Sequence, residues 1–109
     1  MSPSKSKALT FTKRDVTNRV AEKIGSTYSS TKGTVDAVFE SLREIMSQDH
    51  RSMRIEIRGF GVFEVKPTKA KPKARNPRTN EVIYVPARRK SHFRPGKELK
   101  SVLKQPLKT

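Results

Sequence analysis

The first clear pattern along the chain predicts a short amphipathic helix. Residues 12–15 have the form of a capping box, in which a Thr oxygen can accept an amide of the first turn and an Asp three residues later can answer it. Val16, Val20 and Ile24 follow at four-residue spacing, which places them on one side of a helix. Gly25 can end that helix because glycine readily adopts the left-handed conformation at helix C-termini.

A second, longer helix is predicted after a hydroxyl-rich stretch at 26–31. Its acidic residues Asp36, Glu40 and Glu44 lie mostly off a single apolar stripe. That stripe consists of Val35, Val38, Phe39, Leu42, Ile45 and Met46. Together the two segments predict a helical hairpin, and six apolar residues on one helix exceed what a small hairpin can cover. We therefore expect the second helix to supply the core of a dimer.

The apolar period then changes from that of a helix to that of a strand. Met53, Ile55 and Ile57 alternate with charged residues, which is typical of a half-buried strand. A tight turn is expected at 59–61, where an aromatic residue lies between two glycines, and a returning strand begins near Phe63.

Between residues 66 and 78 the apolar pattern gives way to Lys, Arg, Ala and three prolines spaced by five residues. A low-complexity, polyproline-like segment is one interpretation. Because alternation resumes at 82–85, a long two-stranded ribbon with its tip near 76–80 is more economical. Both strands of such a ribbon are edges, so they tolerate proline. The ribbon has no core of its own and is expected to be mobile without a partner.

The last predicted element is a short helix. A basic cluster at 88–90 precedes it, and Pro95–Gly96 opens it. Its apolar residues are Leu99, Val102 and Leu103. The predicted order is α-α-β-β-β-α, which places the chain in the α+β class.

Charge adds a functional expectation to this pattern. The 109 residues carry 25 Lys and Arg against 10 Asp and Glu, a formal net charge of +15. Residues 1–65 contribute 11 basic and 8 acidic side chains, whereas residues 66–109 contribute 14 basic side chains and two acidic ones. Such a cationic second half predicts a polyanion as partner, with the first half as a folded platform.

Composition excludes several other classes. The absence of cysteine rules out a disulfide scaffold, a Cys-ligated zinc site and a thiol nucleophile. No apolar run approaches the roughly 20 residues needed to span a bilayer, and the N-terminus lacks an apolar signal segment, so we expect a soluble, intracellular protein without a membrane partner. His50 and His92 are isolated and no phosphate-cradling loop is present. We expect that the protein is not an enzyme and that it has no cofactor, no bound metal and no small-molecule substrate.

Three motifs carry a family resemblance. Gly59–Phe63 reads GFGVF, Arg75–Thr79 reads RNPRT, and Phe93–Lys100 reads FRPGKELK. In this order and spacing the chain resembles the bacterial HU / integration host factor family of DNA-bending proteins, from about Phe11 to Leu103. The resemblance implies an intertwined dimer with a helical base, a β-sheet saddle and two β-ribbon arms that wrap DNA in the minor groove.

The same resemblance suggests a domain plan. A DNA-binding domain is expected at 11–105, with its arm at about 66–86. A flexible basic extension would precede it at 1–10, where it is an additional candidate DNA-binding tail, and a short tail would follow at 106–109.

The chain departs from the family pattern in its arm. Ala74 stands where the family usually has Gly, and Asn80 replaces the Gly at the tip. Asn tolerates a left-handed backbone better than most residues. From Phe63 to Pro77 the chain is one residue longer than the common pattern, so the ascending arm strand is expected to carry a bulge.

Pro77 is the sharpest functional candidate. A proline at a ribbon tip presents a rigid apolar wedge that can insert between base pairs and kink the duplex, although it can also simply end strand pairing. The resemblance favours the wedge and places Arg75, Asn76 and Arg78 in the minor groove beside it. Further arm contacts are expected from Lys66, Lys69, Lys71 and Lys73.

Other basic residues are candidates for the phosphate and saddle surface, where binding would be steeply salt-dependent. They are Arg58, Arg88, Arg89, Lys90, Arg94, Lys97 and Lys100. Each alone is also compatible with an idle solvated side chain, and Lys13 is another candidate of that kind. The expected dimer core consists of Val38, Phe39, Leu42, Ile45, Phe60, Phe63 and Phe93. The phenylalanines could instead stack on single-stranded bases.

These observations predict a nucleoid-associated architectural protein of the bacterial cytoplasm. It would act as a homodimer, or as a heterodimer with a paralogue, and would bend and compact double-stranded DNA largely without sequence specificity. Two alternatives stay open: a site-specific, integration-host-factor-like cofactor of recombination or transcription, and a basic RNA-binding structural protein.

Overall fold

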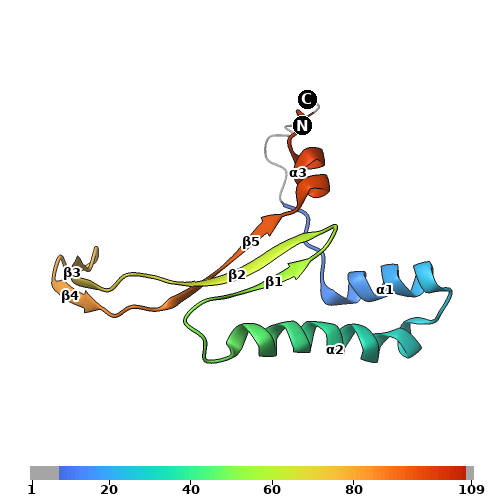
Figure 1. Cartoon of the computed structure of the whole chain (residues 1–109), viewed down its shortest axis with the longest axis horizontal. Helices are drawn as coiled ribbons and strands as arrows, with labels where there is room; N and C mark the ends of the chain where they lie inside the picture. The colour runs from blue at the N-terminus through green and yellow to red at the C-terminus, as the bar shows by residue number, and fades with distance from the viewer. Residues whose placement is uncertain (1–7, 108–109) are drawn as a thin grey trace. The chain divides into compact units, whose positions relative to one another are not determined.

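The computed structural model describes residues 8–107, which comprise two compact units divided between Ser47 and Gln48. Residues 1–7 of the expected extension and residues 108–109 of the expected tail therefore lie outside the described residues. Figure 1 shows the elements in chain order. They are α1 (Lys13–Ile24) and α2 (Tyr28–Ser47) in the first unit, and β1 (Met53–Ile57), β2 (Gly61–Pro67), β3 (Lys71–Arg75), β4 (Val82–Val85), β5 (Arg89–Pro95) and α3 (Lys97–Leu103) in the second. The α+β class is confirmed.

Both ends of α1 follow from local sequence, as predicted. The Asp15 carboxylate accepts hydrogen bonds from the Thr12 amide at 2.7 Å and from the Thr12 hydroxyl at 3.0 Å. These bonds lower the pKa of Asp15, and its negative charge lies at the positive end of the helix dipole. Gly25 ends the helix with φ 68°, and the amide of Ser26 reaches back to the Ala21 carbonyl at 2.9 Å.

The buried residues of α1 and α2 are three small residues and one member of the predicted apolar stripes, Val35. Thr17, Ala21, Thr31 and Val35 are each less than 7% exposed. Both threonine hydroxyls donate to the carbonyl four residues earlier, Thr17 to Lys13 at 2.8 Å and Thr31 to Thr27 at 2.7 Å, so neither is buried without a partner. The small side chains let α1 and α2 pack closely.

Apart from Val35, no residue of either apolar stripe is buried in the single chain. On α2, Val38 is 53% exposed and Phe39 and Ile45 are exposed by about two fifths. On α1, Val16 and Ile24 are also exposed. A surface of this kind on a small protein normally marks a contact with another molecule.

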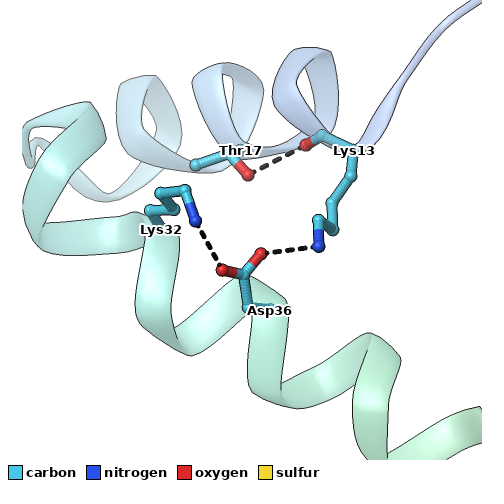
Figure 2. Close-up of polar contacts among 4 residues, drawn as sticks. All are labelled: Lys13, Thr17, Lys32 and Asp36. Atoms are coloured by element: carbon cyan, nitrogen blue, oxygen red, sulfur yellow. Dashed lines mark hydrogen bonds and ion pairs between the residues drawn. The ribbon is translucent and has the colours of Figure 1, made fainter.

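An ion-pair triad joins the two helices. Asp36 of α2 lies 2.9 Å from Nζ of Lys13 on α1 and 2.8 Å from Nζ of Lys32, one turn earlier on α2 (Figure 2). The pairing with Lys32 and then with Lys13 lowers the pKa of Asp36. Lys13, a possible DNA contact from sequence, is thus engaged within the helical unit.

In the second unit, β2 is the central strand of an antiparallel sheet ordered β1-β2-β5. The predicted turn between β1 and β2 is confirmed: Gly59 has φ 79°, and the Phe60 amide donates to the Ile57 carbonyl at 3.0 Å. The rings of Phe60, Phe63 and Phe93 form one cluster, with centroids 4.8 to 6.3 Å apart. Base-stacking platforms would need free ring faces, whereas these rings face one another.

The ribbon formed by β3 and β4 extends beyond β2 and β5 (Figure 1). The predicted three strands are thus five segments, because residues 68–70 and 86–88 interrupt the two long strands. Pro67 ends β2 and Pro86 follows β4, and a proline cannot donate a hydrogen bond to a ladder. The predicted tip is confirmed at 76–80, where Asn80 adopts φ 62°.

Helix α3 begins after Gly96, whose amide donates to the Phe60 carbonyl at 2.8 Å. This bond ties the start of the helix to the turn between β1 and β2. Val102 and Leu103 of α3 are more than half exposed. Among residues 8–107, no helix has the length and apolar character required to cross a membrane.

Candidate nucleic-acid interface

Strand pairing gives the three-stranded sheet two chemically different faces. Residues directly opposite each other in antiparallel strands lie on the same face. Arg54, Glu64 and His92 form one such row, and Glu56, Val62 and Arg94 form the next. We define the basic face as these two rows together with the Lys66–Lys90 pair. The opposite face carries the apolar residues of β1 and the phenylalanine rings of β2 and β5.

Glu64 lies at the centre of the basic face and is only 4% exposed. Its carboxylate oxygens lie 3.6 Å from Nζ of Lys66 and 3.7 Å from Nη1 of Arg94. A buried carboxylate would be costly without such cations nearby. Lys66 and Arg94 thus lie on either side of the Glu64 carboxylate, and both remain more than 60% exposed at their side chains.

Arg54 is a basic-face residue that the sequence analysis did not single out. Its guanidinium lies 3.0 Å from the Glu56 carboxylate on the same strand. Both side chains are more than half exposed, so the pair is well solvated and weak. The alternation of 53–57 already carried the signal, since the polar positions of that strand must share one face.

The structure separates Arg89 from its neighbour Lys90. Lys90 lies on the basic face, whereas Arg89 pairs with Pro67 on the opposite face. The Arg89 guanidinium donates to the backbone carbonyls of Gln48 at 2.5 Å and His50 at 3.2 Å. Arg89 thus holds the chain that leads into β1, a structural role that the basic cluster at 88–90 did not reveal.

The remaining saddle candidates lie outside the sheet ladder. Arg58 lies in the turn after β1, and Arg88 lies in the break between β4 and β5, where its amide bonds the Thr68 hydroxyl at 3.0 Å. Lys97 and Lys100 lie three residues apart on α3 and therefore share one side of that helix. All four are exposed.

The arm carries a shallow hollow of about 690 Å³. Ala74, Pro77, Ile83 and Val85 supply apolar lining, and basic residues on both strands surround it. The basic lining residues are Lys69, Lys71, Arg75, Arg88, Arg89 and Lys90. A hollow lined by both apolar and basic side chains suits a ligand that has an apolar sugar edge and anionic phosphates. Lys66 and Lys73, also predicted as arm contacts, lie on β2 and β3 and are exposed.

The tip around Pro77 is closed by its own hydrogen bonds. The Asn76 amide donates to the Glu81 carbonyl at 2.8 Å, and the Arg75 guanidinium donates to the Asn80 carbonyl at 3.1 Å. The Asn76 side chain accepts from the Arg78 amide at 2.9 Å. Pro77 is exposed at the start of this turn. Pro77, the predicted wedge, therefore lies in a hydrogen-bonded turn, between Arg75 and Arg78 in the sequence.

The predicted dimer-core residues fall in both units. Val38, Phe39, Leu42 and Ile45 lie on α2, and the three phenylalanines cluster on the apolar side of the sheet. Phe60 is 45% exposed, while Phe63 and Phe93 are half-buried. None of the seven is fully buried in the single chain.

Comparisons with known proteins agree with this geometry. Residues 11–104 match a family model described as bacterial DNA-binding protein. Integration host factor subunit alpha of Pseudoalteromonas translucida is 37% identical over 85% of this chain and 90% of its own length. DNA-binding protein HU-1 of Halalkalibacterium halodurans is 38% identical over 84% of this chain and 97% of its own length. A structure titled as an Anabaena HU–DNA cocrystal matches with a TM-score of 0.74 at 31% identity, covering 88% of this chain and 100% of that one.

Proposed function

The chain belongs to the bacterial DNA-binding protein family that includes HU and integration host factor, and we propose that it bends and compacts duplex DNA as a homodimer, through the minor groove and largely without sequence specificity. Members of this family are DNA-binding, DNA-bending architectural proteins and not enzymes. The proposed site of action is the nucleoid in the bacterial cytoplasm.

One observation carries the mechanism: the hollow of the arm ends at an exposed proline on a hydrogen-bonded tip. In the proposed complex the arm follows the minor groove, Arg75 and Arg78 enter its negative potential, and Pro77 separates a base step. Unstacking a step costs a few kcal/mol. The basic face offsets this cost by binding the phosphates of the bent flanks.

The proposal that the protein is a homodimer rests on the exposed apolar residues of α1 and α2. With Val38 53% exposed and Phe39 and Ile45 exposed by about two fifths, a single chain leaves the longest helix without a cover. A second copy supplies an identical apolar stripe, which satisfies a two-fold symmetric interface. A paralogue with a similar stripe would serve equally, which makes a heterodimer the alternative pairing.

Förster transfer between the labelled ends of a short duplex tests the bending. A large rise in transfer at saturating protein is expected for the wild type. For Pro77→Ala we expect binding with a much smaller rise. Pro106→Ala, a proline outside the arm, is the matched control and should behave as wild type. Binding by wild-type protein without any rise would refute bending and direct attention to structured RNA as the ligand.

Light scattering after size exclusion tests the dimer. Val38→Asp places a charge in the proposed interface and should give a monomer, while Glu40→Lys, on the same helix but off the apolar stripe, should leave the dimer intact. A monomeric wild type would refute the proposed dimer independently of the bending experiment.

Site-specific binding is the second candidate, because relatives named HU and integration host factor are similar to this chain by almost the same identity. Competition with random-sequence DNA separates the two. A non-specific protein loses all of its bound probe, whereas a site-specific one retains one site.

A further inference from the structure

The arm contains one residue more on its ascending strand than on its descending strand. Throughout β2 and β5 the pairing is regular, from Gly61 opposite Pro95 to Pro67 opposite Arg89. Lys71 opposite Val85 continues that register without a shift. Ala74 then lies opposite Ile83. Two residues of β3, Pro72 and Lys73, therefore face a single residue of β4, Tyr84, which defines a β-bulge.

The chemistry of the bulge residues suits this position. The extra residue of a bulge is unpaired in the ladder, and a proline there forfeits no hydrogen bond because it has no amide hydrogen. Tyr84 is 64% exposed, so no packing of its ring opposes the bend that a bulge introduces. The bulge expected from sequence is confirmed, and Pro72 is one of its two residues.

The bulge determines how the tip is paired. Beyond it, Arg75 lies opposite Val82, and its guanidinium bonds the Asn80 carbonyl at 3.1 Å. If the register of β2 and β5 continued unbroken, Arg75 would lie opposite Glu81, the single acidic residue between 65 and 97. Opposite charges on directly facing residues attract, so Glu81 would compete with DNA for the arginine.

A β-bulge also bends the strand that carries it and increases the local twist. We propose that the bulge of Pro72 and Lys73 against Tyr84 sets the direction in which the tip presents Pro77 and Arg75 to DNA, and thereby sets the bend, while the basic face supplies most of the affinity. This inference rests on the proposed function of Pro77 as the wedge.

Two variants remove the bulge by opposite routes. In the first, Pro72 is deleted from the otherwise complete chain, so that Lys73 alone lies opposite Tyr84. In the second, one threonine is inserted after Tyr84, so that Pro72 and Lys73 lie opposite the new threonine and Tyr84. Both variants leave Arg75 opposite Val82 and remove only the bend of the bulge, so in both the rise in end-to-end transfer on a labelled duplex should fall to that of Pro77→Ala. The slope of log affinity against log salt should fall by at most about 0.9, the value of one phosphate contact. Pro72→Ala, which keeps the residue count, is the matched control and should bend DNA as wild type does.

The outcomes separate this inference from the function on which it rests. If both variants without the bulge bend DNA as wild type does while Pro77→Ala does not, the role of the bulge is refuted and the wedge role of Pro77 stands. If Pro77→Ala also bends DNA normally, the role of Pro77 as a wedge is refuted, and the proposed role of the bulge is refuted with it. Should the deletion fail to fold, judged by circular dichroism, the insertion decides, because it leaves β3 at full length.

Discussion

Replacing Gly61 by alanine is expected to destabilise the three-stranded sheet strongly. Gly61 begins β2 opposite Pro95 and is buried. A Cβ at this position would lie 2.5 Å from the Arg94 carbonyl oxygen and 2.8 Å from two carbons of the Phe93 ring. Carbon atoms pack at about 3.5 to 4.0 Å, so neither contact can be tolerated without movement.

The magnitude follows from what must move. The Arg94 carbonyl is backbone of β5, so relieving that contact spreads the β2–β5 ladder. Overpacking of this kind costs about 1–3 kcal/mol. Moving the Phe93 ring also disturbs its contacts with Phe60 and Phe63, each worth about 0.5–1.5 kcal/mol beyond buried area. We therefore expect a loss of about 2–4 kcal/mol in the free energy of unfolding.

Gly33 provides the matched control, because the same substitution there meets nothing within 4 Å. It lies within α2, where alanine is favoured over glycine by about 0.5–1 kcal/mol. Urea unfolding followed by circular dichroism, at one fixed protein concentration since a dimer is expected, measures both variants. Gly61→Ala should lower the midpoint and Gly33→Ala should raise it. A Gly61→Ala protein as stable as wild type would refute the close approach of β5 to β2 at this point.

Three further predictions concern charge and backbone conformation. The pKa values of Asp15 and Asp36 are lowered in the folded state, so their stabilising effect is present above their ordinary pKa and is lost as the pH falls through the lower folded value. The urea midpoint of Asp36→Asn should therefore depend less on pH below about pH 4 than that of the wild type. If the two proteins showed the same dependence on pH, the triad would be excluded as a contributor to stability. Lys90→Ala should reduce the slope of log DNA affinity against log salt by about 0.9, with little change in the stability of the fold. Arg89→Ala should instead lower that stability, because it removes the hydrogen bonds to two backbone carbonyls. A loss of stability in Lys90→Ala and a change of slope in Arg89→Ala would contradict the assignment of these residues to opposite faces. Asn80→Val should destabilise the arm tip because a β-branched residue disfavours φ 62°, whereas Asn80→Gly should be tolerated. The exchange rate of the Asn76 amide hydrogen, which bonds across the tip, should rise in Asn80→Val and stay unchanged in Asn80→Gly.

Local chemistry in the sequence was sufficient for most of the elements. The capping box at Thr12, the stop at Gly25, the turn at 59–61 and the tip at 76–80 all depend on residues within a few positions of one another, whose backbone preferences act whatever surrounds them. The bulge could also be predicted, because an extra residue in one strand of a hairpin must be accommodated somewhere. The family resemblance added the proposed roles of Arg75, Asn76 and Pro77 in DNA binding, whereas periodicity alone leaves Pro77 undecided between a wedge and a turn.

Only the tertiary structure decided which side chains meet. Glu64 lies between Lys66 and Arg94 because β5 pairs with β2, and Lys13 reaches Asp36 because two helices cross at small threonine and alanine side chains. Arg89 and Lys90 are adjacent and both basic, yet strand pairing places them on opposite faces. Arg89 bonds backbone carbonyls, whereas Lys90 lies on the basic face. These contacts join residues that are distant in the chain, and their energy depends on distance and burial in space, which no local period encodes.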